Sequence, residues 1–493
     1  MSTNRQERAL TSPTRTVIAI LLLSLILRWA LVIRGGQYYF SDEQRYEVSR
    51  QIANFIVQGE FSEAFSHLFA APEHLGFKII GILPALIEKL TGPSLVIPAL
   101  FFSLFSVLNL FLVFLLARRA GATQSESLLA LVIAAASQSL LYYSRHLMPY
   151  DTAMSFGLLS LYAALKPGAT TKTSLLCGVL SFLCFITYNG YWILAGFAML
   201  CHVFAGKKDF SVLLRRGILL AVGFTAPLIL MVLSARLAEI DLIVEYAKFA
   251  GTVNQGDYSE GWSLPFEYFW HTEHFLIVIV GVLALLAVFS IFTSNDRYPL
   301  WWLAGLSFVY ACLVLFSVYF QSFVVLGRLA RQMMPFLALV SAYGLARLAT
   351  QTPFWRNVSI LVMILVLFQG FWNYGISFAQ SYPREFSSEA QAQYEDFTFS
   401  PKRLIFGAPS LCHNSGYAME NAKYFLTATE TNPEINGTVL LSESHPVNFL
   451  PYQYEGYTPE QRQQFRRRNL QMTFYKLDSD TELKDIKNCF IKE

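Results

Sequence analysis

Residues 17–33 read VIAILLLSLILRWALVI, and residues 34–46 continue as RGGQYYFSDEQRY. The first stretch is as long as a short transmembrane helix, which needs roughly 17–25 apolar residues. Arg34-Gly35-Gly36 is not a small-x-small cleavage site, so we expect a retained first span and not a signal peptide. The acidic pair Asp42-Glu43 then lies just beyond the span, at the membrane–water interface. Acids in that position suggest chemistry on a lipid-linked substrate.

The composition of the whole chain is that of a polytopic membrane protein. Of its 493 residues, 54% are hydrophobic and 14% are charged, and the mean hydropathy is +0.42. Soluble domains carry roughly 25% charged residues. The net charge of +3 is small, and the chain has no basic domain interleaved with aromatic residues that would indicate a nucleic-acid partner. We therefore expect membrane lipids, and no nucleic acid, around this protein.

Ten further apolar runs follow the first one, which predicts about eleven transmembrane helices. These runs cover residues 94–117, 125–143, 147–165, 173–187, 189–205, 213–235, 274–293, 299–319, 324–349 and 357–378.

Basic residues in the short loops predict the orientation of the chain, because such loops face the cytoplasm. They are Arg5, Arg8 and Arg15 at the N-terminus, then Arg118-Arg119, Lys166, Lys172, Lys207-Lys208, Arg215-Arg216, Arg297, Arg347 and Arg356. The N-terminus is then cytoplasmic, while loops 34–92 and 236–272 and the C-terminal region are extracytoplasmic. We expect a multi-pass protein of a bacterial inner or plasma membrane.

Two regions are not expected to cross the membrane. Loop 34–92 has a predicted interfacial helix that starts at Ser41, with Gln44 at the capping-box position. Val48, Ile52, Phe55 and Ile56 share one face of this helix, which predicts that it lies flat on the membrane surface.

Residues 380–493 form the second region, a predicted small soluble α/β domain after a transmembrane domain of residues 1–379. Its predicted strands are 404–406, 438–441, 472–477 and 489–491, and its predicted helices are 414–426 and one that starts at Thr458. Cys412 and Cys489 could form a disulfide if this domain is extracytoplasmic.

Polar residues at the ends of the outer spans and in the outer loops form the main candidate site. They are Asp42, Glu43, Glu73, His74, Lys78, Arg145, His146, Asp151, Arg328 and Arg331. A cavity that holds carboxylates beside cations suits one task, because a carboxylate takes the proton of an acceptor hydroxyl while the cations stabilise a departing phosphate.

Three segments resemble the GT-C superfamily of polytopic glycosyltransferases. Residues 41–50, SDEQRYEVSR, are similar to the first-loop signature of the aminoarabinose transferase and protein O-mannosyltransferase branches. Residues 142–151, YYSRHLMPYD, resemble the segment between the third and fourth spans, and residues 328–335, RLARQMMP, resemble a late Arg-x-x-x-Pro segment. Glu73-His74 lies where the aminoarabinose branch has an acid followed by a lysine and then a proline, so His74 and Leu75 depart from that pattern.

The resemblance implies an inverting transfer of a sugar from a polyprenyl-phosphate carrier to a glycan, lipid or protein acceptor on the extracytoplasmic side. It implies Asp42 as catalytic base with Glu43 in support, and Glu73 as a second acid. The cations implied for the phosphate are Lys78, Arg145, Arg328 and Arg331. No cofactor is expected. Some GT-C branches use a divalent ion, which Asp42, Glu43 and Glu73 could hold, although the sequence does not favour a metal site.

Other interpretations stay open. Asp42-Glu43 could complement a helix dipole, Asp151 could cap a helix, and Arg328 and Arg331 could extend to the headgroups. The alternative function is a multi-pass transporter or flippase for a lipid-linked or anionic substrate, and a third is a membrane scaffold. A transporter usually has repeated halves and mid-membrane charges, whereas here the charges gather at one face and the halves differ, which favours the enzyme.

Overall fold

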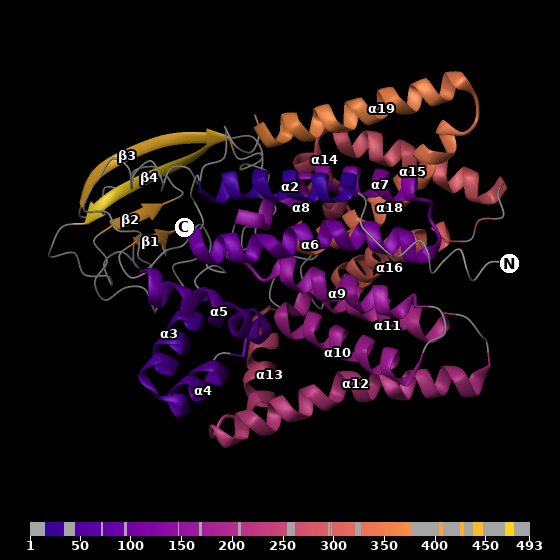
Figure 1. Cartoon of the computed structure of the whole chain (residues 1–493). Coiled ribbons are helices and arrows are strands. Elements are labelled where there is room, and N and C mark those ends of the chain that lie inside the picture. Colours follow the sequence, from indigo (N-terminus) through magenta and orange to yellow (C-terminus); the bar gives the residue numbers. More distant parts are fainter. Residues whose placement is uncertain are drawn as a thin grey trace.

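The computed structural model describes residues 15–33, 45–70, 72–92, 96–145, 147–166, 170–205, 209–253, 262–293, 296, 298–320, 327–375, 404–407, 424–427, 437–446 and 469–477. Most of these residues are helical (Figure 1). The N-terminal helices are α2 (Arg15–Ile33), α3 (Arg45–Gln58), α4 (Phe61–Ala70), α5 (Leu75–Thr91), α6 (Val96–Ala120), α7 (Gln124–Ala136), α8 (Gln138–Tyr142), η2 (Tyr143–Arg145), α9 (Tyr150–Ala164), α10 (Thr171–Thr187), η3 (Asn189–Tyr191) and α11 (Trp192–Phe204). They are followed by α12 (Phe210–Leu237), α13 (Leu242–Val253), α14 (Leu264–Glu273), α15 (Phe275–Thr293), α16 (Pro299–Val314), η4 (Leu315–Tyr319), α17 (Gly327–Ala330), η5 (Arg331–Met333), α18 (Met334–Ala349) and α19 (Pro353–Trp372).

Each of the eleven predicted spans coincides with a helix or a broken helix. Six of the described segments are long and apolar enough to cross a membrane: Arg15–Ile33, Val96–Ala120, Phe210–Leu237, Phe275–Thr293, Pro299–Tyr319 and Pro353–Gly375. Large apolar side chains on the outside of the bundle, such as Leu230 and Phe368, are exposed by more than half, as expected where lipid surrounds a helix. The chain is an integral membrane protein, and the exact number of spans stays a prediction.

Local sequence explains where several helices begin. Thr123 and Glu126 form a capping box at the start of α7, and Thr170 and Thr173 form another at α10. Thr352 caps α19, whose first residue is a proline. These caps all follow the short basic loops, so the polar turns and the helix starts are encoded together.

Helices α9 and α18 form the centre of the bundle, and almost all of their side chains are buried. Helix α9 packs against α6, α10 and α11, and α18 packs against α7, α15 and α16. Helices α10 and α12 approach each other closely at Gly178 and Gly223, because a Cβ atom on Gly223 would lie 2.4 Å from the carbonyl oxygen of Leu175. Small residues permit this kind of backbone contact between membrane helices.

Two predicted spans are broken. The run 125–143 divides at Ser137 into α7 and α8, and the run 324–349 contains α17 and η5 before α18 begins at Met334. Both breaks bring polar residues into the interior of the bundle, as the site geometry below shows.

Helix α3 confirms a helix within loop 34–92, although Ser41 and Gln44 lie outside the described residues. Its buried face consists of Tyr46, Ser49, Ile52 and Ala53, and it packs against α4 and α5. Val48, which the sequence assigned to the apolar face, is only half-buried. Contact with the membrane surface stays a prediction.

The described part of the C-terminal region is a four-stranded sheet in the order β1-β2-β4-β3. Its strands are β1 (Leu404–Gly407), β2 (Tyr424–Thr427), β3 (Gly437–Pro446) and β4 (Asn469–Leu477), with β1 parallel to β2 and the other pairs antiparallel. Three of the predicted strands are confirmed. The predicted helix 414–426 is wrong at its end, because Tyr424–Leu426 pairs with Phe474–Lys476 as a strand. The remaining predicted helices, the strand 489–491 and the two cysteines lie outside the described residues.

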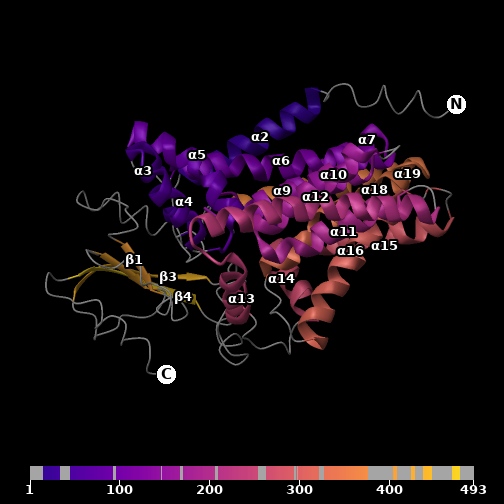
Figure 2. The same ribbon diagram turned by 90° about the horizontal axis from the view of Figure 1, so that it is seen from below.

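The sheet and helices α3, α4 and α5 lie at the same end of the helix bundle in both views (Figures 1 and 2).

Candidate functional site

A buried ion pair joins two of the predicted site residues, Asp151 and Arg331. Asp151 lies in the first turn of α9, and Arg331 begins η5 at the break before α18. Nη2 of Arg331 donates to Oδ1 of Asp151 at 2.6 Å, and the side chains are 0% and 6% exposed, respectively. The Arg331 guanidinium also lies 4.6 Å from the centre of the Tyr143 ring. A helix 180 residues further along the chain therefore supplies the counter-charge for Asp151.

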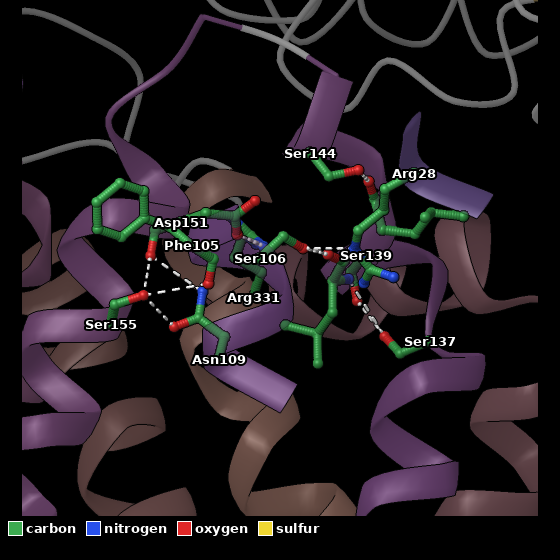
Figure 3. Close-up of polar contacts among 12 residues, drawn as sticks. Arg28, Phe105, Ser106, Asn109, Ser137, Ser139, Ser144, Asp151, Ser155 and Arg331 are labelled. Carbon is green, nitrogen blue, oxygen red and sulfur yellow. Dashed lines mark hydrogen bonds and ion pairs between the residues drawn. The ribbon is translucent and has the colours of Figure 1, made fainter. Parts of the chain in front are cut away.

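A network of hydrogen bonds holds the Asp151 backbone in place (Figure 3). The Asp151 carbonyl oxygen accepts from Nδ2 of Asn109 at 3.0 Å and from Oγ of Ser155 at 3.0 Å. The Ser155 hydroxyl is also within 2.8 Å of Oδ1 of Asn109. Helices α6 and α9 thus fix the position from which the Asp151 carboxylate extends.

Not all polar atoms of the ion pair have partners. Within the described part of the chain, Oδ2 of Asp151 and both Nε and Nη1 of Arg331 are buried without a hydrogen bond. Buried polar atoms are nearly always hydrogen-bonded in folded proteins. Three such atoms in one ion pair indicate a place where a ligand can bind.

Arg28 is a functional candidate that the sequence reasoning missed. It lies in the last third of α2, and its side chain is 1% exposed. Its Nε donates to Oγ of Ser106 at 2.9 Å, and its Nη1 donates to the carbonyl oxygen of Ser24 at 3.2 Å. Its charge interacts favourably with Asp151 and unfavourably with Arg331. The signal was present, because Arg28 is the only ionisable residue in the run 17–33, and such residues in spans are usually functional.

Aromatic rings connect Arg331 with His74, which was another predicted site residue. Tyr143, beside Arg331, contacts Tyr150 with ring centres 4.8 Å apart, and Tyr150 contacts Tyr188 at 4.8 Å. The Tyr188 ring lies 5.0 Å from that of His74. His74 itself has a left-handed backbone (φ 53) just before α5. A chain of three tyrosine rings thus connects His74 of loop 34–92 with Arg331.

The break between α7 and α8 is held by Glu273, the last residue of α14. Its carboxylate accepts from the backbone N–H groups of Gln138 and Ser139, both at 2.9 Å, and from the hydroxyls of Ser137 and Ser139. Burial raises the pKa of Glu273, while these four donors act in the opposite direction. Glu273 thus anchors the start of the segment that leads to Tyr143.

Helix α3 is attached to α5 by a second polar cluster. The Tyr46 hydroxyl donates to Oε1 of Glu88 at 3.0 Å, and Nε of Arg50 donates to Oε2 at 2.8 Å. Ser49 donates to the backbone carbonyl of Lys78 at 2.9 Å. This cluster fixes the helix that directly follows the Asp42-Glu43 pair in sequence.

The other predicted residues are described to different extents. Lys78 is buried and Glu73 is half-buried. Glu73 acts on Tyr246 of α13, whose pKa is raised by burial and by that carboxylate, and Lys78 acts on His67, whose pKa is lowered by burial and by that ammonium group. The backbones of Arg145 and Arg328 are helical, but their side chains lie outside the description, as do Asp42, Glu43 and His146.

The search for metal sites concerns only part of the predicted set. Within the described ranges, no three His, Cys, Asp or Glu side chains are grouped so that they could hold a metal ion. Two of the three residues that could hold a divalent ion, Asp42 and Glu43, lie outside those ranges, so the metal question stays a prediction.

The chain has known structural relatives but no match in sequence. No family model matches the chain, and no curated protein sequence matches it. It is similar in structure to ArnT, an aminoarabinose transferase, from Cupriavidus metallidurans. The apo ArnT structure has a TM-score of 0.55 and 12% identity, and the match covers 93% of this chain and 97% of ArnT. ArnT bound to undecaprenyl phosphate has the same TM-score and identity, with 85% and 87% covered.

The likeness to ArnT is one of fold. It extends over nearly the whole of both chains, and it confirms the predicted polytopic helical fold.

Proposed function

We propose that this protein transfers a sugar from a polyprenyl-phosphate carrier to an acceptor hydroxyl on the extracytoplasmic face of the membrane. The observation that carries the proposal is the likeness in fold to ArnT, which has been seen with undecaprenyl phosphate bound. The buried site around Asp151 and Arg331 supports it independently, because phosphate release needs fixed positive charge in a water-poor place.

The reaction is a single displacement at the anomeric carbon. The acceptor hydroxyl gives its proton to a carboxylate, for which Asp42 is the candidate and Glu43 and Glu73 are supporting acids. The acceptor oxygen then bonds to the anomeric carbon while the bond from that carbon to the phosphate oxygen breaks, and its electron pair leaves with polyprenyl phosphate. The configuration of the sugar is inverted.

The arrangement of helices explains why loop 34–92 would supply the base. Helix α3 begins at Arg45, two residues after Glu43, and the Glu88 cluster fixes α3 against α5. The neighbouring His74 and Lys78 are buried at the start of α5, where they could contact the donor. Arg145, His146 and Arg328 belong to the segments that flank Asp151 and Arg331, and are candidates for the phosphate or the sugar.

A transfer assay tests the proposal. Purified full-length protein is incubated with a panel of polyprenyl-phosphate sugars and acceptors, and the release of polyprenyl phosphate is measured. We expect release to require Asp42, so that Asp42→Asn is inactive but folded. Glu63→Gln, an exposed acid of the same loop, is the matched control and should keep full activity. An Asp42→Asn variant with wild-type activity would refute the assignment.

The same preparation in liposomes distinguishes the enzyme from a transporter. A flippase moves the labelled lipid to the other leaflet without releasing polyprenyl phosphate, whereas the transferase releases it. We expect no loss of transfer on treatment with a chelator, in keeping with the absence of a cofactor from the proposed reaction. A rate that falls with a chelator and returns with a divalent ion would contradict that expectation.

A further inference from the structure

Arg28 is a cation in the interior of the helix bundle that has no carboxylate partner among the described residues. Two of its nitrogen atoms donate to neutral oxygens of Ser106 and Ser24, and its Nη2 has no hydrogen-bond partner in the described part of the chain. Arginines near span ends often extend to the lipid headgroups. Here that outward position belongs to the next residue, Trp29, which is 38% exposed, while Arg28 is 1% exposed.

The charges around Arg28 do not balance. Of the two ionisable groups that act on it most strongly, Asp151 is already paired with Arg331 at 2.6 Å. The two guanidinium groups and the one carboxylate of this trio, Arg28, Arg331 and Asp151, have a net charge of +1. Removing an ion from water without a partner costs several kcal/mol. The group also has three nitrogen atoms without acceptors, Nη2 of Arg28 and Nε and Nη1 of Arg331.

We propose that Arg28 and Arg331 together bind the phosphate group of the lipid-linked donor. The inference rests on the proposed function and adds to it a binding residue from the first span. An anionic phosphate supplies the missing charge and the missing acceptors at once. Oδ2 of Asp151, the unpartnered acceptor of the group, can accept a hydrogen bond from a sugar hydroxyl of the donor.

The charge of the site fits the direction of the reaction. A sugar linked through a phosphate diester carries one negative charge, and the departing polyprenyl phosphate carries up to two. The negative charge therefore grows at the phosphate as its bond to the anomeric carbon breaks. A site with a net charge of +1 stabilises this change, and its cations cost no reorganisation because they are already fixed.

The structure predicts an unusual stability signature for Arg28. If Arg28 is replaced by Met, the Ser106 hydroxyl still donates to the carbonyl oxygen of Leu140 at 3.0 Å. The carbonyl of Ser24 lies inside α2 and is bonded by the helix backbone. The substitution therefore leaves no buried polar group without a partner, and it removes an uncompensated charge. Arg28→Met should raise the melting temperature of the ligand-free protein, whereas a purely structural arginine would lower it.

The test compares ligands that share a phosphate or a tail. Thermal unfolding and equilibrium binding of the full chain in detergent are measured with farnesyl phosphate, farnesol, inorganic phosphate and phosphatidylglycerol. We expect farnesyl phosphate, and not farnesol, to stabilise the wild type. Arg28→Met should bind farnesyl phosphate at least 10-fold more weakly, and Arg28→Lys should fall between the two. Arg347→Met, which removes a half-exposed arginine paired with Asp296, should bind like the wild type.

Each other outcome overturns the inference. Wild-type affinity in Arg28→Met, or a lower melting temperature with an unchanged response to farnesyl phosphate, would show that Arg28 is structural. Equal stabilisation by inorganic phosphate or phosphatidylglycerol would mean that the site does not recognise a prenyl phosphate. If Arg28→Met binds farnesyl phosphate with full affinity while the wild type transfers sugar, the role of Arg28 is refuted and the proposed function stands. A wild type that neither binds farnesyl phosphate nor transfers sugar would refute the proposed function as well.

Discussion

The buried charges predict an asymmetry between the two halves of the Asp151–Arg331 pair. Removing one partner of a buried ion pair costs about 3–5 kcal/mol, because the other charge is left uncompensated. Asp151→Asn leaves two guanidinium groups, Arg28 and Arg331, which repel each other. Arg331→Gln leaves Asp151 with Arg28 as an opposite charge. The first substitution should therefore destabilise the ligand-free protein more than the second.

The size of the asymmetry follows from Coulomb's law. Two unit charges about 4 Å apart interact with about 4 kcal/mol at an effective dielectric constant of about 20, and with about half of that at twice the distance, so we assign about 2 kcal/mol to each interaction of Arg28 with the ion pair. In Asp151→Asn the attraction between Asp151 and Arg28 is lost, while the repulsion between Arg28 and Arg331 remains. In Arg331→Gln the attraction remains and the repulsion is lost. Arg331→Gln also loses the contact with the Tyr143 ring at 4.6 Å, which is worth about 0.5–2 kcal/mol. We expect a net difference of about 2–3.5 kcal/mol, which is the two charge interactions together less the contact with the ring.

Reversible unfolding in mixed micelles with increasing sodium dodecyl sulfate measures these free energies. A third variant sharpens the test, because Arg28→Met in the Asp151→Asn background removes one of the two repelling cations and should recover about 2 kcal/mol. Glu245→Gln breaks the exposed Glu245–Lys248 pair on α13 and should change stability by less than about 1 kcal/mol. If Asp151→Asn lowers the free energy of unfolding no more than Arg331→Gln does, or if adding Arg28→Met to Asp151→Asn does not raise it again, the reasoning from the three buried charges is wrong.

Three further predictions concern the supports of the site. Glu88→Gln should weaken the two hydrogen bonds that hold α3 by about 1.5–3 kcal/mol, and hydrogen exchange of α3 should speed up while that of α18 stays unchanged. Gly223→Ala should lower the melting temperature, because the new Cβ would lie 2.4 Å from the Leu175 carbonyl oxygen. Gly217→Ala on the same helix is the control, since its Cβ would meet nothing within 4 Å, and it should be neutral or stabilising. Equal effects of the two substitutions would contradict the close packing of α10 and α12. The pKa of Glu273 is raised above its ordinary value of 4.5, so above pH 4.5 the folded state binds more protons than the unfolded state. The free energy of unfolding should therefore fall as the pH rises from 4.5 through the raised pKa. Glu273→Gln should make the melting temperature depend less on pH, and an unchanged dependence would exclude Glu273 as its source.

The helices were predictable from the sequence because their signals are local. Each of the eleven apolar runs coincides with a helix or a broken helix of the structure, and the Thr123 and Thr170 capping boxes can be read directly from the chain. The break at Ser137 could not be read, since it is stabilised by Glu273, which is 136 residues away. The strand at Tyr424–Thr427 was missed for the same reason, because its pairing with β4 overrides the local helical preference.

The site was predictable only in part. The sequence placed Asp151 and Arg331 in one constellation, and the structure joins them at 2.6 Å. The ion pair itself joins the first turn of α9 to the break before α18, 180 residues further along the chain, and no local pattern encodes that contact. Arg28 was a different kind of omission, because a lone arginine in an apolar run is a signal that needs no structure.

The division of charge between these three residues explains how one site can be both stable and reactive. A fully neutral ion pair would hold its helices in place but would offer nothing to a departing phosphate. A lone buried guanidinium would attract phosphate but would destabilise the empty protein. Here Asp151 neutralises Arg331 and fixes its orientation, so that only the charge of Arg28 stays uncompensated. In the ligand-free protein only the charge of Arg28 is destabilising, and the donor phosphate compensates that charge when it binds. If this reasoning holds, the melting temperature with and without farnesyl phosphate should differ more for the wild type than for any variant that lacks Arg28.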